Sequence, residues 1–315
     1  MPIYLILAAG LVALVVGADW LVKGASSIAT RLKIPSYVIG LTLVACGTSL
    51  PEFTVNMISA SKGYTDIAFG NVVGSNIFNI LAILGIGSMI FPIMTARRMV
   101  KVDLTISLGV TLLLLAQVLI DRLLMTSGMV ISFVDGLVLI LVMIMYVRFL
   151  LKSGSAESEE TMDTASWPKT VFYVLSGLGL LVLGSQFLIE SSVSLARAWG
   201  LSERVIGLTI VSAGTSLPEL ATTVTAALKR HHDIAFGNIV GSNIFNILWI
   251  MSFTAILKPI PVSAAGLNDL YIDIAATIML FGLIYVGKKY HIERWQGALM
   301  LLTYVGYVGY LLKQA

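Results

Sequence analysis

Long apolar runs separated by short polar breaks dominate the chain. Each run has roughly 20 residues or more, the length that an α-helix needs to cross the hydrocarbon of a bilayer. The pattern predicts an all-α membrane protein with ten transmembrane helices, at residues 3–22, 36–61, 66–91, 102–121, 130–151, 169–194, 203–228, 233–257, 267–286 and 296–313.

One substantial polar stretch, residues 153–168, interrupts this pattern and is rich in Ser, Glu and Thr. Such a composition is typical of a flexible linker, and the stretch is too short to hold a domain. It divides the chain into residues 1–152 and 169–315, with five predicted spans in each part.

The composition supports a membrane protein and excludes several other classes. Of the 315 residues, 57% are hydrophobic and 12% are charged, against about 25% charged in a soluble domain. The net charge of +3 is too small to suggest a nucleic-acid partner, and three His with one Cys cannot build a common zinc or iron–sulfur site. We therefore expect no enzyme, no cofactor and no obligatory protein partner, with the lipid bilayer as the surroundings.

The distribution of Lys and Arg predicts the orientation. If the N-terminus lies outside, about 14 of the 20 basic residues, including Lys229 in a loop, fall on the cytoplasmic side. Cytoplasmic loops carry an excess of Lys and Arg, so the count favours both termini outside and a cytoplasmic linker. No basic residue precedes the first span, which therefore reads as a retained helix rather than a signal peptide.

An internal repeat links the two halves. Residues 40–80 match residues 207–247 at a constant offset of 167, with roughly 26 of the 41 positions identical. The shared cores are GTSLPE and DIAFGN..GSNIFN. Because five spans separate the copies, they must cross the membrane in opposite directions. Inverted repeats with a substrate site at their interface are typical of secondary transporters.

Two carboxylates, Glu52 and Glu219, fall at equivalent places near the middle of apolar spans. An intramembrane carboxylate is costly and commonly marks an ion or proton pathway. The alternative is a protonated, hydrogen-bonded glutamate, but the recurrence in both copies favours an ion site. Pro51 and Pro218 each remove a backbone donor, and neighbouring glycines let the helix loosen, which would expose carbonyl oxygens.

Hydroxyl and amide groups accompany each glutamate. Thr48 and Ser49 precede Glu52 by four and three residues, so they share its helix face. The next helix carries polar side chains at four-residue intervals. The repeated groups are Thr48, Ser49, Asn71, Ser75 and Asn79 in the first copy and Thr215, Ser216, Asn238, Ser242 and Asn246 in the second. Asn71 and Asn238 have interhelical hydrogen bonding as an alternative role, and Asn76 and Asn243 point off this stripe and are interpreted as structural.

These groups offer only oxygen ligands, which suits hard cations. Calcium takes six to eight oxygens in flexible geometry, whereas transition metals favour His or Cys. Two carboxylates give the site a charge of about −2, which one Ca²⁺ or two or more Na⁺ could neutralise. An empty site would leave buried unpaired charges, at a cost of several kcal/mol each. The chain should therefore exchange ions rather than leak them.

At these motifs the chain resembles the calcium/cation antiporter superfamily, whose repeats carry G-T-S-x-P-[ED] and G-S-N-x-x-[ND] on successive helices. Both motifs occur twice here, and the resemblance covers essentially the whole chain. It implies a prokaryotic sodium/calcium exchanger of the plasma membrane, with ten helices in inverted repeats and Ca²⁺ transport driven by Na⁺. The linker is too short for the regulatory calcium-binding domains of animal exchangers.

The resemblance also implies a role for each motif position. Glu52 and Glu219 would be the central Ca²⁺ ligands, shared with Na⁺. Ser75 and Ser242 would bind Na⁺ in flanking sites. The remaining implied ligands are Thr48, Thr215, Ser49, Ser216, Asn79 and Asn246, with Ala45 and Ser212 at positions where the family uses a backbone carbonyl for Na⁺.

Asn246 is a departure from part of the family. The potassium-dependent branch has Asp at this position, so Asn246 argues against potassium dependence and leaves two central carboxylates. The main alternative is a proton-coupled Ca²⁺ antiporter of the same fold, although that branch carries a glutamate on the partner helix that this chain lacks. A passive cation channel is the alternative from another class.

Overall fold

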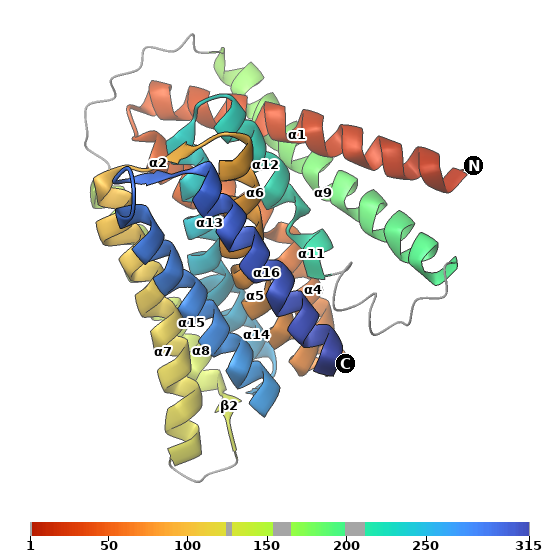
Figure 1. Ribbon diagram of the computed structural model, residues 1–315, viewed down its shortest axis with the longest axis vertical. Coiled ribbons are helices and arrows are strands. Elements are labelled where there is room, and N and C mark those ends of the chain that lie inside the picture. The colour runs from red at the N-terminus through yellow and green to blue at the C-terminus, as the bar shows by residue number, and fades with distance from the viewer. Residues whose placement is uncertain (1, 124–127, 154–164, 199–211, 315) are drawn as a thin grey trace.

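The computed structural model describes residues 2–123, 128–153, 165–198 and 212–314, and within them the chain is almost entirely helical (Figure 1). In the first half, the helical segments are α1 (Pro2–Leu32), α2 (Ser36–Ile39), η1 (Gly40–Val44), α3 (Ala45–Thr48), α4 (Leu50–Ser61), α5 (Thr65–Phe78), η2 (Asn79–Ile83), α6 (Leu84–Ile90), η3 (Met99–Asp103), α7 (Leu104–Leu123) and α8 (Phe133–Ser153), where η denotes a π-helix.

The second half repeats this order. Its helical segments are α9 (Trp167–Ala198), α11 (Ser212–Thr215), α12 (Leu217–Leu228), α13 (His232–Phe245), η5 (Asn246–Met251), α14 (Ser252–Leu257), α15 (Ala264–Tyr285) and α16 (Arg294–Gln314). The predicted linker, residues 153–168, lies mostly outside the described residues. Residues 207–211, which begin the second copy of the 41-residue repeat, also lie outside them.

Two short antiparallel ribbons join the halves and are the exception to the all-α prediction. Strand β1 (Ile93–Met94) pairs with β4 (His291–Ile292), and β2 (Val130–Ile131) pairs with β3 (Ile260–Pro261). Each ribbon takes one strand from a loop of each half, so the two halves are tied together at these loops. Ile93, Ile131, Ile260 and Ile292 are completely buried and anchor the ribbons in the core.

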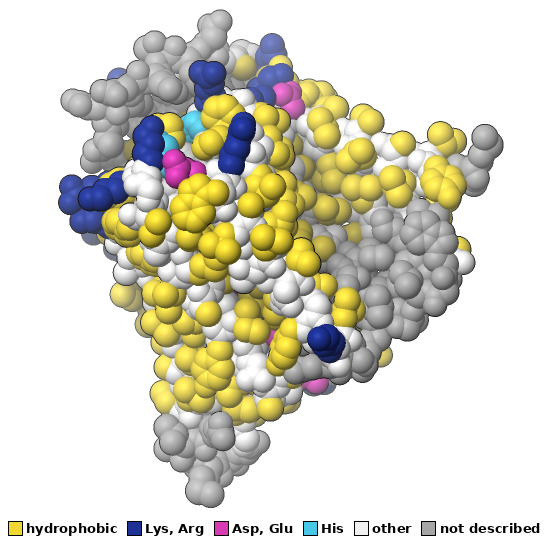
Figure 2. Space-filling view, in the orientation of Figure 1, with side chains coloured by type: hydrophobic (Ala, Val, Ile, Leu, Met, Phe, Trp, Pro, Cys, Tyr) yellow, Lys and Arg dark blue, Asp and Glu magenta, His cyan; other side chains and the backbone are white. Residues whose placement is uncertain are grey.

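The exterior of the bundle is apolar. Leu5, Leu175 and Leu302 are 70%, 64% and 69% exposed, and hydrophobic side chains cover most of the visible flank while Lys and Arg gather toward one end (Figure 2). An apolar flank of this kind needs lipid around it. The protein is therefore a multi-pass integral membrane protein.

Fewer than the ten predicted spans are found when the described helices are counted by length and apolar composition. Among the described residues, seven helices are long and apolar enough to cross a membrane, and the bent pair Ser36–Thr48 and Leu50–Ser61 adds an eighth if it is one span. The predicted span 203–228 lies partly outside the described residues. Helix α16 has 21 residues but is not among the seven, because its Tyr and Gly residues lower its mean hydropathy.

Helices α1 and α9 are the two longest described helices, and they lie side by side along one side of the bundle (Figure 1). At 31 and 32 residues, both are longer than the predicted spans 3–22 and 169–194. Glycines make the close approach possible, because a Cβ on Gly177 would lie 2.7 Å from the backbone nitrogen of Leu21 and one on Gly184 would lie 2.8 Å from the carbonyl oxygen of Gly10. Small residues at a helix crossing are typical of packing in membranes.

We expect Gly177→Ala to destabilise the protein, because the new methyl group would meet the backbone of α1 and force the helices apart. Overpacking of this kind costs about 1–3 kcal/mol, which thermal unfolding in detergent would show as a lower midpoint. Gly179→Ala is the matched control, since a Cβ at that position meets nothing within 4 Å. Equal midpoints for the two variants would contradict the close contact.

Candidate ion-binding site

Each copy of the repeat contains a broken helix. Helix α3 ends at Thr48 and α4 begins at Leu50, with Ser49 between them at φ −81° and ψ 9°, and the two parts are bent by 44°. Ser216 makes the equivalent break between α11 and α12, at φ −90° and ψ 10°. Pro51 lies in the first turn after the first break, as the sequence predicts. Backbone hydrogen bonds still cross the breaks, since Ser49 N donates to Ala45 O at 3.1 Å and Leu220 N donates to Ser216 O at 3.1 Å, so the breaks change the direction of the helices more than they free backbone groups.

The glutamates begin the second part of each broken helix. Glu52 and Glu219 lie in the first turns of α4 and α12, where the helix dipole favours negative charge. Both side chains are 1% exposed. The polar side chains around these glutamates come from both halves of the chain.

The serines at the two breaks cross between the halves. Ser49 Oγ donates to Glu219 Oε1 at 2.9 Å, and Ser216 Oγ donates to Glu52 Oε1 at 2.7 Å. Each glutamate is thus held by the serine of the other repeat. The serine that bonds each glutamate therefore comes from the opposite half of the chain.

A second ring of contacts repeats this exchange. Ser49 Oγ lies 3.2 Å from Ser242 Oγ, and Ser216 Oγ lies 3.1 Å from Ser75 Oγ. All four hydroxyl groups are buried. The residues predicted for the flanking sites therefore lie next to the central glutamates.

The threonines and the first asparagine of each stripe also pair across the halves. Thr48 Oγ1 donates to Asn238 Oδ1 at 3.1 Å, and Thr215 Oγ1 donates to Asn71 Oδ1 at 3.4 Å. The amide group of Asn71 donates to Asn56 Oδ1 at 2.8 Å, and that of Asn238 donates to Thr223 Oγ1 at 3.0 Å. Both amides are hydrogen-bonded through oxygen and nitrogen to other helices, which favours interhelical hydrogen bonding as the role of Asn71 and Asn238.

The last asparagine of each stripe lies at the junction of an α-helix and a π-helix. Asn79 begins η2 and Asn246 begins η5, and single π-helical turns are frequent at functional sites. Asn79 Nδ2 donates to Asn243 Oδ1 at 2.9 Å, and Asn246 Nδ2 donates to Asn76 Oδ1 at 3.0 Å. Asn76 and Asn243, which the sequence interpretation treats only as structural, orient these two amides.

Four buried oxygen atoms at this centre have no hydrogen-bond partner. They are Oε2 of Glu52, Oε2 of Glu219, Oδ1 of Asn79 and Oδ1 of Asn246, the same atoms in both copies. A buried acceptor without a partner costs about 1–3 kcal/mol, and more when it is charged. An amide oxygen and an ionised carboxylate oxygen can accept a hydrogen bond and cannot donate one, and oxygens of this kind are also able to bind a hard cation.

Ala45 and Ser212 stand apart from the other predicted ligands. The carbonyl oxygen of Ala45 accepts from Thr48 Oγ1 at 3.3 Å and lies 3.5 Å from Ser242 Oγ, so it borders the site. Ser212 begins α11, but its side chain lies outside the described part of the chain. No cluster of three or more His, Cys, Asp or Glu occurs among the described residues, which agrees with a site built from two carboxylates and neutral oxygens.

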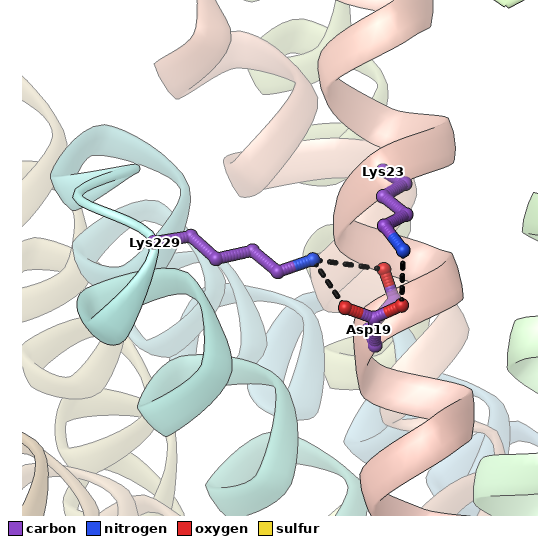
Figure 3. A network of polar contacts seen from close by, with 3 residues as sticks. All are labelled: Asp19, Lys23 and Lys229. Atoms are coloured by element: carbon purple, nitrogen blue, oxygen red, sulfur yellow. Dashed lines mark hydrogen bonds and ion pairs between the residues drawn. The ribbon is translucent and has the colours of Figure 1, made fainter.

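Lys229, which the sequence places in a loop, follows the last residue of α12 and is held by an ion pair. Its Nζ forms an ion pair with Asp19, which also pairs with Lys23 at 2.7 Å (Figure 3). Lys229 Nζ also donates to the carbonyl oxygen of Asp19 at 3.4 Å. The contact ties the end of α12 to α1, so a substitution of Lys229 would not be an inert control.

Comparison with known proteins identifies the class. The sequence profile of the family described as sodium/calcium exchanger protein matches residues 2–152 and 169–313. The chain belongs to this family of antiporters and is a transporter rather than an enzyme.

Relatives resemble the chain over nearly its full length. It is 41% identical over 308 residues to CaxA of Alkalimonas amylolytica, a proposed antiporter, covering 95% of each chain. It is 31% identical to the sodium/calcium exchanger MaX1 of Methanosarcina acetivorans, covering 97% of each. A solved structure of the sodium-calcium exchanger NCX_Mj, soaked with Na⁺ and Sr²⁺, matches with a TM-score of 0.82 at 30% identity, covering 96% of each chain.

Ser49→Ala and Ser216→Ala should weaken cation binding to a similar extent, because the two serines make equivalent bonds to the opposite glutamates. Loss of a hydrogen bond to a charged group costs about 1.5–3 kcal/mol, or at least about tenfold in affinity. Isothermal titration of the purified protein with Ca²⁺ measures this. Ser61→Ala, at an exposed position of α4, is the control. A large effect from only one of the two buried serines would contradict the symmetric site.

Proposed function

We propose that the protein exchanges Na⁺ for Ca²⁺ across the membrane by alternating access, with the ions bound near the midplane between the two repeats. The observation that carries this proposal is the set of four buried, unpaired oxygen atoms on Glu52, Glu219, Asn79 and Asn246. Ser75 and Ser242, which are also predicted ligands, lie next to the serines that bond the glutamates and offer further oxygens.

The ligand chemistry favours Ca²⁺ and Na⁺. Carboxylate, amide, hydroxyl and backbone oxygens suit a hard cation, and Ca²⁺ accepts six to eight of them in irregular geometry. Mg²⁺ demands near-octahedral geometry and keeps several waters. Both MaX1 and NCX_Mj are named sodium/calcium exchangers, which supports the same pair of ions here.

The charge of the site supports exchange rather than leakage. Two ionised glutamates give the site a charge of about −2, and buried charges without partners cost several kcal/mol each. Because the empty site is costly, it should reorient across the membrane only after it has bound ions of sufficient positive charge. One Ca²⁺ and two or more Na⁺ both meet this condition.

The exchange of contacts between the halves supports alternating access. The hydrogen bonds that Ser49, Thr48 and Asn79 make to the opposite half have counterparts from Ser216, Thr215 and Asn246, as a two-fold relation requires. With ten spans in two inverted five-helix repeats, the two copies would face opposite sides, and the site at their interface could open to either side. In this arrangement the termini lie outside and residues 153–168 form a cytoplasmic linker.

Proton coupling is the second candidate, because the glutamates could carry protons as well as Na⁺. The resemblance to CaxA, a proposed antiporter whose coupling ion its name does not give, leaves this candidate open. Potassium dependence is disfavoured by Asn246, where the potassium-dependent branch has a carboxylate.

Uptake of ⁴⁵Ca²⁺ into proteoliposomes separates these candidates. With Na⁺ inside and none outside, we expect rapid uptake, because outward movement of Na⁺ drives Ca²⁺ inward. A proton gradient alone should give little uptake, and vesicles without a gradient should give none above the passive leak. Uptake driven only by protons would establish the second candidate, and equal uptake in all three conditions would indicate a channel.

Glu52→Gln and Glu219→Gln should each reduce Na⁺-driven uptake at least about a hundredfold. Each variant removes one of the two negative charges that would balance the bound cation, and an unbalanced buried charge costs several kcal/mol. The proteins should still fold, as shown by size-exclusion chromatography and thermal unfolding. Lys152→Ala, at an exposed position near the end of α8, is the control. Wild-type uptake by either glutamine variant would refute the shared acidic site.

A further inference from the structure

A third buried carboxylate, Asp273, lies beside the candidate ion-binding site but outside both copies of the repeat. It belongs to α15 and is 1% exposed. Asn76 Nδ2 donates to its Oδ2 at 3.4 Å, while its Oδ1 is buried without a partner. Among the described residues no Lys, Arg or His forms an ion pair with it.

Asp273 ends a chain of hydrogen bonds that begins at the ion site. Asn246 Nδ2 donates to Asn76 Oδ1 at 3.0 Å, and Asn76 Nδ2 donates to Asp273 Oδ2. Both amides therefore donate in the direction of Asp273. An ionised carboxylate can only accept, so it holds the amide of Asn76 with Nδ2 toward Asp273 and Oδ1 toward Asn246. With its Nδ2 committed to Asn76, Asn246 keeps Oδ1 as the atom that is free to bind a cation.

The first half has no such carboxylate. Asn76 Nδ2 and Asn243 Nδ2 donate to each other's backbone carbonyl groups, at 3.4 and 3.3 Å, and these bonds are the same in both halves. The residue equivalent to Asp273 is Ser107, because the hydroxyl groups of Thr111 and Thr277 donate to the carbonyl oxygens of Ser107 and Asp273 in the same way, at 3.1 and 2.9 Å. Asp273 is thus an addition in one half.

In the part of the chain that the structure describes, no positively charged side chain pairs with Asp273. One turn earlier on α15, Asp269 accepts from the hydroxyl group of Tyr307 on α16 at 2.9 Å, and these are neutral or acidic groups. A buried carboxylate without a counter-ion is costly. The cation bound between Glu52 and Glu219 is the positive charge that can offset it, across the two amides of Asn76 and Asn246.

We propose that Asp273 is a positioning residue for the ion site. Its carboxylate orients Asn76 and through it Asn246, so that Asn246 Oδ1 stays directed for binding, and it adds a third negative charge to the two glutamates. This role makes the second half of the site the stronger cation-binding half. The proposal rests on the proposed transport of Ca²⁺ at this site.

Asp273→Asn tests the proposal, because Asn keeps the size of the side chain and removes the charge and the fixed direction of the bond. In Na⁺-loaded proteoliposomes we expect the KM for Ca²⁺ to rise about tenfold, within the usual range of coupling between sites, with the maximal rate little changed. Ser107→Ala, at the matched position of the first half, should leave KM unchanged. A wild-type KM for Asp273→Asn, or a lower maximal rate at unchanged KM, would overturn the proposal.

A rescue experiment separates positioning from a general packing effect. Asn246→Asp places a carboxylate at the site itself, where it presents oxygen in either orientation and no longer needs to be directed. In the background of Asp273→Asn it should return KM to within about threefold of the wild type, a difference of less than about 1 kcal/mol. If KM stays high, Asp273 acts through packing and the proposal fails.

Two further measurements keep the test decisive. If Asp273→Asn does not fold, Asp273→Ser, which copies the residue of the first half, takes its place with the same expectations. Titration of the purified wild type and variant with Ca²⁺ needs no transport. If the wild type lacks Na⁺-driven uptake, the proposed function fails, but an equal affinity of the two proteins for Ca²⁺ is what would refute the role of Asp273.

Discussion

The burial of two carboxylates in a bundle that is apolar on its outside is the constraint on which the rest of this structure depends. Glu52 and Glu219 are almost completely buried, and their negative charge needs compensation that hydrocarbon cannot give. The protein itself compensates one oxygen of each carboxylate, which accepts a hydrogen bond from a serine of the opposite repeat. The other oxygen of each has no hydrogen-bond partner, and in the proposed exchange it is the atom that would bind the transported cation.

The architecture around the glutamates follows from this need. Breaking each helix at a serine places the glutamate in a first turn and frees the serine to reach the other repeat. The π-helical turns at Asn79 and Asn246 begin where each amide crosses to the partner half. The result is a set of reciprocal contacts that neither half makes alone. In the proposed alternating access, the two halves would move relative to each other around an ion bound at these contacts.

Much of the site could be predicted from the sequence because the repeat shows it twice. The repeat identified the glutamates and their serines, and Pro51 marked the helix break. The predicted helix face shared by Ser49 and Glu52 is interrupted by that break, and each serine bonds the glutamate of the other repeat instead. The crossed pairing of the two repeats could not be read from either copy, since it depends on how the halves dock. Asp273 was missed because it lies outside the repeat, although the two acidic residues Asp269 and Asp273 in one apolar span were a signal for it. The ion pair of Lys229 with Asp19 joins residues 210 positions apart, and no local pattern encodes such a contact.

Equilibrium binding of Ca²⁺ tests the central claim, that the two halves build one cation site between them. Isothermal titration of the purified protein in Na⁺-free buffer should give one Ca²⁺ per chain, competed by added Na⁺, and either Glu52→Gln or Glu219→Gln alone should abolish it. Two Ca²⁺ per chain, with each glutamine variant keeping one of them, would show that each repeat holds its own ion and would contradict the shared site.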